Sequence, residues 1–224
     1  MSNCVEVVAI VEGKTEEIFI KDILQPYLAN KNVFITPIII SKPGQKGGDV
    51  KFARVKNDIE KHLKQRPDTY LTLFIDFYGV KSDWPGVNDA EGISGPKGKA
   101  DFVNQATKEK VVEHFGEQNA EERFIPYMAM YEFEALLFSA PAILARKLQI
   151  DESQVVSIIE ECGEPENIDN SQVTAPSKRL ESLSLKFRKT TTGIAILKEA
   201  GLTAIRGKCP IFDGWVTSLE NIAG

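Results

Sequence analysis

Acidic residues that could hold a divalent cation follow three of the predicted strands of this chain. Glu12 and Glu16 come after the first strand, Asp76 ends the third, and Glu132 and Glu134 follow the fourth. In an open α/β sheet, ligands bind beyond the carboxyl ends of the strands, so we expect these acids at one edge. Clustered carboxylates repel one another unless a cation lies between them. Because ligation by oxygen alone suits Mg²⁺ or Mn²⁺ and not zinc, the pattern predicts a magnesium or manganese site.

Each of these acids also has an ordinary structural explanation. Glu12 or Glu16 could stabilise the positive end of the helix that follows the first strand. Asp76 could form a turn, and Glu132 and Glu134 could lie on a solvated helix face. Short motifs match by chance often. It is the recurrence of acids at corresponding strand ends that favours the metal site.

A second candidate, a phosphate-binding loop, fails on spacing. Gly13-Lys14-Thr15 is similar to the end of the pattern G-x-x-x-x-G-K-[ST], but its first glycine would fall on Val8, inside the predicted strand. Without that glycine the loop cannot wrap its backbone N–H groups around phosphates. The sequence therefore excludes nucleotide hydrolysis at this loop.

Alternating strand and helix patterns must position the acids. Apolar runs predict strands at residues 5–11, 33–40, 70–77 and near 124–130. Between them, helical spacing predicts helices at 15–28, where Pro26 should bend or end the helix, at 52–63 and at 101–115. A Gly- and Pro-rich segment, 79–98, is expected to be a lid-like loop over the acids. The order predicts an α/β fold with a mostly parallel central sheet flanked by helices.

The pattern changes after residue 132, where short helical segments replace the alternation. We therefore predict two parts, an α/β core at 1–140 and a C-terminal helical appendage at 141–224.

Composition limits the class of protein. The 224 residues include 27 Lys and Arg against 32 Asp and Glu, so bulk positive charge cannot hold this chain on nucleic acid. The apolar runs are too short to span a bilayer, and the first residues lack the basic region of a signal peptide. Three widely separated cysteines, Cys4, Cys162 and Cys209, argue against a disulfide framework. We expect a cytoplasmic protein.

Positive charge is nevertheless concentrated in one segment. Residues 176–210 contain eight Lys and Arg but two Glu. They could supply phosphate contacts beside the metal, or they could lie on ordinary solvated helix faces. The sequence leaves both interpretations open.

Six motifs resemble those of a bacterial family, domain-of-unknown-function family 4276, which is Toprim-like. They are V-E-G-x-T-E-E at 11–17, D-x-Y-G at 76–79, E-F-E-A-L-L-F at 132–138, P-E-x-I at 165–168, P-S-K-R-L at 176–180 and R-x-x-C-P-x-F-x-x-W at 206–215. The Glu-x-x-x-Glu spacing of Glu12 and Glu16 is also similar to that of the overcoming-lysogenization-defect nucleases, whose Toprim domain binds two divalent metals. The resemblance implies a Toprim-like core.

The resemblance also implies a function. It suggests a Mg²⁺- or Mn²⁺-dependent nuclease acting on DNA or RNA, with Lys14 or a later basic residue such as Arg179 stabilising charge on the phosphate. It further suggests an ATPase partner of the ATP-binding-cassette kind and a role in phage defence. One position departs from the usual Asp-x-Asp, because Tyr78 replaces the second acid. The alternative is a non-catalytic Toprim-like module that docks on the ATPase.

Overall fold

A parallel sheet forms the centre of the protein, for which we describe a computed structural model over residues 4–41, 50–168 and 174–223. The strands are β1 (Val5–Val11), β2 (Val33–Ile39), β3 (Tyr70–Asp76), β4 (Phe124–Ile125) and β5 (Met128–Ala129). Their order is β2-β1-β3-β4, with β5 also paired to β3, and every pair is parallel. The last five residues of β1 are all buried, as expected where helices cover both faces of a strand. The predicted α/β class is confirmed.

The fourth predicted strand forms as two short pieces. β4 pairs with β3 near its start, at Leu71 and Thr72, and β5 pairs with its end. Pro126 lies between the two pieces and has no N–H group to donate to the ladder. The interruption keeps β5 beside Asp76, the last residue of β3, which pairs with Ala129.

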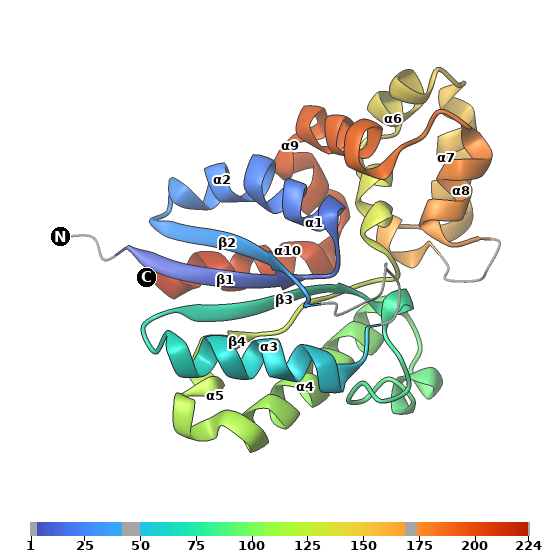
Figure 1. Cartoon of the computed structure of the whole chain (residues 1–224). Coiled ribbons are helices and arrows are strands. Elements are labelled where there is room, and N and C mark those ends of the chain that lie inside the picture. The colour runs from blue at the N-terminus through green and yellow to red at the C-terminus, as the bar shows by residue number, and fades with distance from the viewer. Residues whose placement is uncertain (1–3, 42–49, 169–173, 224) are drawn as a thin grey trace.

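Helices cover both faces of the sheet (Figure 1). One face carries α1 (Lys14–Phe19), α2 (Gln25–Ala29), α9 (Ile194–Lys208) and α10 (Pro210–Glu220), and the other carries α3 (Phe52–Gln65) and α4 (Pro96–Phe115), with α5 (Ala120–Arg123) beside α4. Phe74 of β3 meets Phe19 and Trp215 on the first face, with ring centroids 6.1 and 5.0 Å apart. The most C-terminal of these helices, α10, therefore packs directly on the central strand.

The first predicted helix continues past Pro26. A wide π turn, Ile20–Leu24, joins α1 to α2, and the N–H of Gln25 donates to the carbonyl of Ile20. Pro26 thus falls in the first turn of α2, where a missing N–H group costs little. The expected end or bend at this proline is replaced by the π turn before it.

On the opposite face of the sheet, helix α3 agrees with its predicted pattern and the segment 79–98 does not. Helix α3 buries the predicted stripe, Phe52, Val55, Ile59 and Leu63. The segment expected to be lid-like is fastened instead. Trp84 is 2% exposed, packs edge-on against Phe52, and donates from Nε1 to Oγ1 of Thr107 on α4 at 2.9 Å. A buried tryptophan therefore ties this segment to the face of the sheet.

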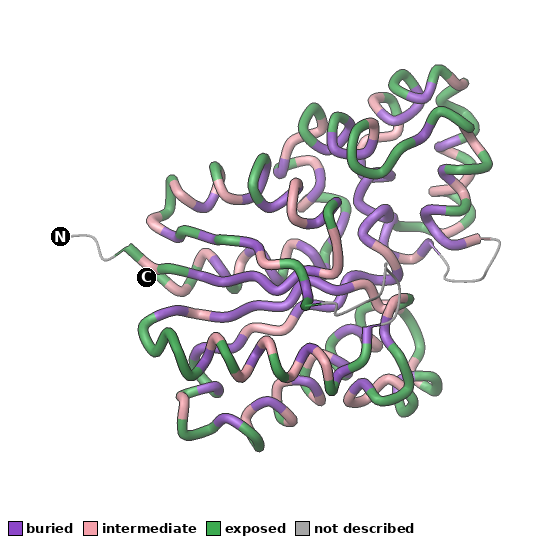
Figure 2. Tube along the Cα trace, in the orientation of Figure 1, coloured by how far each residue is buried: buried purple, intermediate pink, exposed green. Residues whose placement is uncertain are grey.

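The remaining helices form a lobe beside the sheet (Figure 1), which we call the helical lobe. It consists of α6 (Pro141–Leu148), α7 (Glu152–Cys162) and α8 (Pro176–Leu183), and the buried 3₁₀ segment η5 (Phe133–Ser139) leads into it. Figure 2 shows buried residues continuing from the strands into the lobe, and one hydrophobic core includes residues from both. The predicted boundary at residue 140 stays a prediction, but α10, which follows it, packs on the sheet, and α9 packs on α1 and the π turn after α1. No described helix is long and apolar enough to cross a membrane.

Candidate acidic site at the carboxyl end of the sheet

Asp76 ends the central strand β3 and is fixed by the chain that follows β5. Its Oδ1 accepts a hydrogen bond from the backbone N–H of Phe133 at 2.8 Å. Since Phe133 begins η5, this bond places Glu134 next to the end of β3. The carboxyl end of the sheet therefore brings together two acids that are 58 positions apart in numbering.

Glu12 follows β1, the strand beside β3, and lies against Gly79. A Cβ atom at Gly79 would be 2.6 Å from Oε2 of Glu12, which is closer than real contacts allow. The glycine therefore leaves room for the carboxylate. This contact joins the loop after β1 to the turn after β3.

Glu16 lies in the first turn of α1 and is 7% exposed. Its Oε2 accepts from the N–H of Gly13 at 2.9 Å, so the carboxylate caps the start of its own helix. Burial raises the pKa of Glu16, and the charge of Glu12 raises it further. The structural explanation from sequence, a stabilised helix end, is thus correct, but it does not remove Glu16 from the site.

The strongest effect falls on Asp76. Burial raises its pKa well above the ordinary value, and the charges of Glu16, Glu134 and Glu12 raise it further. We call these four residues, Glu12, Glu16, Asp76 and Glu134, the acidic cluster. The expected gathering of acids at strand ends is therefore present in the structure.

Lys189 supplies positive charge to this cluster. Its Nζ lies 3.0 Å from Oε2 of Glu134, whose side chain is 2% exposed. Burial raises the pKa of Glu134 to about 7 although Lys189 lowers it. Burial lowers the pKa of Lys189, but Glu134 outweighs this and the net shift is upward. The lysine remains an ammonium ion beside a carboxyl group that titrates near neutrality.

Glu132 binds the start of α8, and its role as a metal ligand stays a prediction. Its Oε2 accepts from the backbone N–H of Ser177 at 2.8 Å, and its Oε1 accepts from the Ser177 hydroxyl at 3.0 Å. Both oxygens thus bind the first turn of α8. The contact fastens the helical lobe to the strand end, and a metal would have to compete with it.

Lys14 and Arg179, the two predicted charge stabilisers, face other partners. Lys14 pairs with Glu17 one helical turn away at 2.7 Å, and its side chain is 64% exposed. Arg179 binds both carboxylate oxygens of Glu161 on α7, at 3.0 and 3.1 Å. Their predicted role therefore has no support in the geometry, because each is held by an acid outside the cluster.

The donor chemistry of the cluster suits a hard cation. Its ligands would be carboxylate oxygens, and the pKa values of Asp76 and Glu134 are raised first by burial and then by repulsion from neighbouring acids, which a divalent ion would relieve. Within 4–41, 50–168 and 174–223, however, no three acidic, histidine or cysteine side chains are already arranged to hold a metal. Binding would require the carboxylates to turn away from Lys189 and the backbone N–H groups.

Sequence reasoning missed two residues of this site. Gly79 belongs to the D-x-Y-G motif, so a signal existed, but only the structure shows that it faces Glu12. Lys189 had no signal beyond its place in a basic segment, since it follows α8 and lies far from the strands in sequence. Within the described part of the chain, Lys189 forms an ion pair with an acid of the cluster, whereas Lys14 pairs with Glu17 and Arg179 pairs with Glu161.

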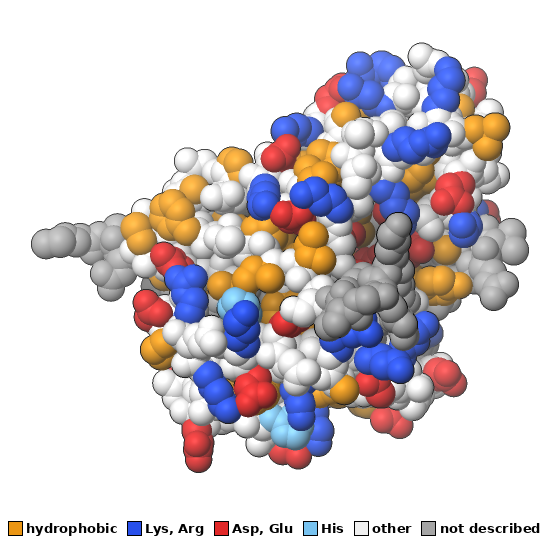
Figure 3. Space-filling model, viewed as in Figure 1, with side chains coloured by type: hydrophobic (Ala, Val, Ile, Leu, Met, Phe, Trp, Pro, Cys, Tyr) orange, Lys and Arg blue, Asp and Glu red, His pale blue; other side chains and the backbone are white. Residues whose placement is uncertain are grey.

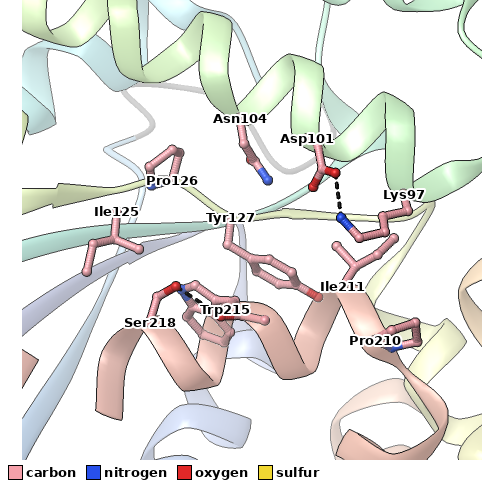
Figure 4. A pocket seen from close by; sticks show the side chains of 11 residues that line it. Lys97, Asp101, Asn104, Ile125, Pro126, Tyr127, Pro210, Ile211, Trp215 and Ser218 are labelled. Atoms are coloured by element: carbon pink, nitrogen blue, oxygen red, sulfur yellow. Dashed lines mark hydrogen bonds and ion pairs between the residues drawn. The ribbon is translucent and has the colours of Figure 1, made fainter. Parts of the chain in front are cut away.

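A separate pocket of about 300 Å³ lies between α4 and α10 (Figure 4). Tyr127 stacks on Trp215 there, with ring planes 10° apart and centroids 4.6 Å apart. At its rim Lys97 is already neutralised by Asp101, at 2.5 Å. The pocket thus offers a mixed polar and apolar lining in which the charged pair is already balanced, whereas the acidic cluster offers unbalanced charge.

Fold and site together define an α/β protein with an acidic cluster at the carboxyl end of a parallel sheet. The sequence model of one family, described as "Domain of unknown function (DUF4276)", matches residues 11–220. The chain therefore belongs to this family. Comparison with curated proteins and with solved structures gave no match.

Proposed function

We propose that the protein is a Mg²⁺- or Mn²⁺-dependent nuclease that hydrolyses phosphodiester bonds at the acidic cluster. One observation carries the proposal, namely that Asp76 stands at the end of the central strand, where burial and then three neighbouring glutamates raise its pKa. This is the edge at which open α/β sheets bind ligands. Perturbed acids that gather in such a place are candidates for chemistry.

The chain's own groups fix the carboxylates. Phe133 N–H holds Oδ1 of Asp76, which leaves Oδ2 for a cation, and Gly13 N–H holds one oxygen of Glu16. Bound by these acids with Glu12 and Glu134, Mg²⁺ or Mn²⁺ would lower the pKa of a water molecule and stabilise charge on the phosphate.

Lys189 is the side chain we assign to the phosphate. Its ammonium group lies at the cluster, and its side chain is 44% exposed, so it can leave Glu134 for a substrate anion. When a cation takes over Glu134, the lysine becomes available at the same place. It then fulfils the role that the sequence gave to Lys14 or Arg179.

The biological setting is proposed from the family resemblance. DNA or RNA is the substrate class, an ATPase of the ATP-binding-cassette kind is the partner, and phage defence is the role. The cytoplasm is the proposed location, which agrees with the free thiols of Cys4, Cys162 and Cys209.

Replacement of Asp76 by Asn tests the function. The amide oxygen can still accept the Phe133 N–H, so the fold should persist while the charge for the cation is lost. We expect cleavage of plasmid and single-stranded substrates in Mg²⁺ or Mn²⁺ to fall about 1,000-fold or more. Asp89→Asn, which removes the same charge from an exposed turn, is the matched control and should cleave normally. Wild-type protein that cleaves nothing, with or without the ATPase, would refute the proposal.

A non-catalytic partner module remains the second candidate, favoured by a specific observation. The Lys189–Glu134 pair already supplies a cation to the cluster, and Tyr78 replaces an expected acid. In that case the protein would bind its ATPase equally well as wild type or as Asp76→Asn. A Mg²⁺-dependent rise in melting temperature, present in the wild type and lost in Asp76→Asn, would argue against this module.

A further inference from the structure

Leu185 is an unusually exposed apolar side chain that lines the same groove as Lys189. It is 91% exposed, whereas the other exposed large hydrophobic residues that the structure describes reach at most 42%. Single exposed leucines are ordinary on protein surfaces. What distinguishes Leu185 is the loop that carries it and the charge around it.

The loop, residues 184–188, is held in place by its own hydrogen bonds. The N–H of Phe187 donates to the carbonyl of Ser184 at 3.1 Å, and the Phe187 ring is buried as an anchor. Nη1 of Arg188 donates to the carbonyls of Leu185 and Phe187 at 2.9 and 2.7 Å. Lys186 Nζ reaches Gln149 at the end of α6, at 3.0 Å. These hydrogen bonds hold the backbone of the loop in place while the side chain of Leu185 projects into solvent.

The surroundings of Leu185 are basic. Among the residues that the structure describes, neither Lys186 nor Arg188 forms an ion pair with a carboxylate. Lys and Arg side chains are also spread over the visible face of the helical lobe (Figure 3). Unbalanced positive charge around an apolar tip is complementary to a polyanion that also has apolar surface. Nucleic acid, with phosphates outside and stacked bases inside, has both.

The tip adjoins the proposed catalytic site. A groove of about 510 Å³ is lined by Glu181, Ser184, Leu185, Phe187, Arg188 and Lys189. Lys189 belongs both to this groove and to the Glu134 ion pair, so this lysine connects the groove with the acidic cluster. A strand whose phosphate lies at Lys189 would have its neighbouring bases beside Leu185.

We propose that Leu185 is a wedge that inserts between bases next to the scissile phosphate, while Lys186 and Arg188 bind the flanking phosphates. The inference rests on the proposed nuclease function and adds how the substrate is held. Apolar side chains used in this way unstack a base step and open the duplex beside it. The substrate class is then a duplex or a stacked strand that must be opened before cleavage.

Fluorescence of a short DNA duplex carrying 2-aminopurine tests the wedge, with Ca²⁺ in place of Mg²⁺ to prevent turnover. Wild-type protein should raise the fluorescence as the base unstacks. Leu185→Ala should abolish this rise and weaken binding about tenfold, whereas Leu185→Met should retain both. Phe34→Ala, an exposed apolar residue beside the start of β1, is the control and should behave as wild type.

The charge partners give an independent readout. The double variant Lys186→Gln, Arg188→Gln should weaken binding to all sequences and lower the slope of log affinity against log salt by about 2, one for each lost phosphate contact. An unchanged slope would show that these residues do not meet the backbone.

Parallel cleavage assays in Mg²⁺ separate the two proposals. If the wild type cleaves DNA but Leu185→Ala binds and unstacks it normally, the wedge is refuted and the nuclease stands; a protein-docking role for Leu185 would give that result. If the wild type neither binds nor cleaves duplex or single strand, the nuclease proposal fails and the wedge fails with it.

Discussion

Glu134 and Glu166 have the same burial and the same titration but opposite surroundings. Each side chain is 2% exposed, and the pKa of each is raised to about 7, chiefly by burial. Glu166 accepts the N–H groups of Ile211 and Phe212, at 2.8 and 2.9 Å, and so caps α10. Glu134 instead faces Lys189 and the other acids.

The difference shows how a buried acid can be assigned a task. Glu166 accepts hydrogen bonds from two backbone N–H groups of α10, and these donors reach it only when α10 is packed in its native position. Glu166 therefore has a structural role. Glu134 lies near Glu16, Glu132 and Lys189, and the side chain of Lys189 is 44% exposed. The partners of Glu134 can therefore be exchanged. A perturbed pKa alone would not distinguish the two. The identity of the neighbours does.

The largest effect is expected when Glu166, the buried acid that caps α10, is replaced. Glu166→Ala leaves two N–H groups of α10 buried without acceptors, which should lower the free energy of unfolding by about 3 kcal/mol and the melting temperature by about 10 °C. Glu134→Ala removes repulsion along with its ion pair and should change stability by less than about 1 kcal/mol. Thermal unfolding of both variants measures this. Equal losses would contradict the distinction.

The pH dependence of stability gives a second test of the structural role of Glu166. Because the pKa of Glu166 rises from 4.5 unfolded to about 7 folded, its protonated form favours folding. Its stabilisation is full below pH 4.5 and is lost as pH rises toward 7. Relative to Glu166→Gln, the wild type should therefore lose about 3 kcal/mol across this range, measured by denaturant unfolding at each pH. Parallel curves for the two proteins would show that Glu166 does not titrate here.

A smaller effect is expected at the acidic cluster from Gly79→Ala. The added Cβ would lie 2.6 Å from Oε2 of Glu12 and must push that carboxylate aside, a cheap movement for a flexible side chain. We expect Mg²⁺ affinity to fall about tenfold, equivalent to about 1.4 kcal/mol, with little loss of stability. Isothermal titration measures the affinity. Gly92→Ala, with open space around its Cβ, is the control and should bind Mg²⁺ normally.

The smallest effect is expected from replacement of Lys14, and replacement of Lys189 is the comparison. Lys14 forms an exposed pair with Glu17, so Lys14→Ala should change stability by less than about 0.5 kcal/mol and cleavage by less than about twofold. Lys189→Ala should lower cleavage far more, because it removes the cation beside Glu134. Cleavage rates of the two variants at saturating Mg²⁺ show which lysine contributes to cleavage. A larger loss in Lys14→Ala would restore the assignment made from sequence.

Much of the fold could be predicted because it depends on local pattern. The buried run of β1 and the stripe of α3 follow from periodicity, and both appear as expected. The place of Asp76 follows as well, since a parallel sheet aligns the carboxyl ends of its strands. The predictions for Pro26 and for the segment 79–98 were wrong because a π turn and the long-range hydrogen bond of Trp84, respectively, decide the local structure.

The sequence by itself determined the sheet, its helices and the edge at which the acids of β1 and β3 meet. Only the tertiary structure decided which charges meet there. Lys189 reaches Glu134, Arg179 turns to Glu161, and Glu132 is taken by Ser177. The reason is physical: strand and helix periodicity act over a few residues, whereas electrostatic partners are chosen by packing between elements that lie far apart in the chain.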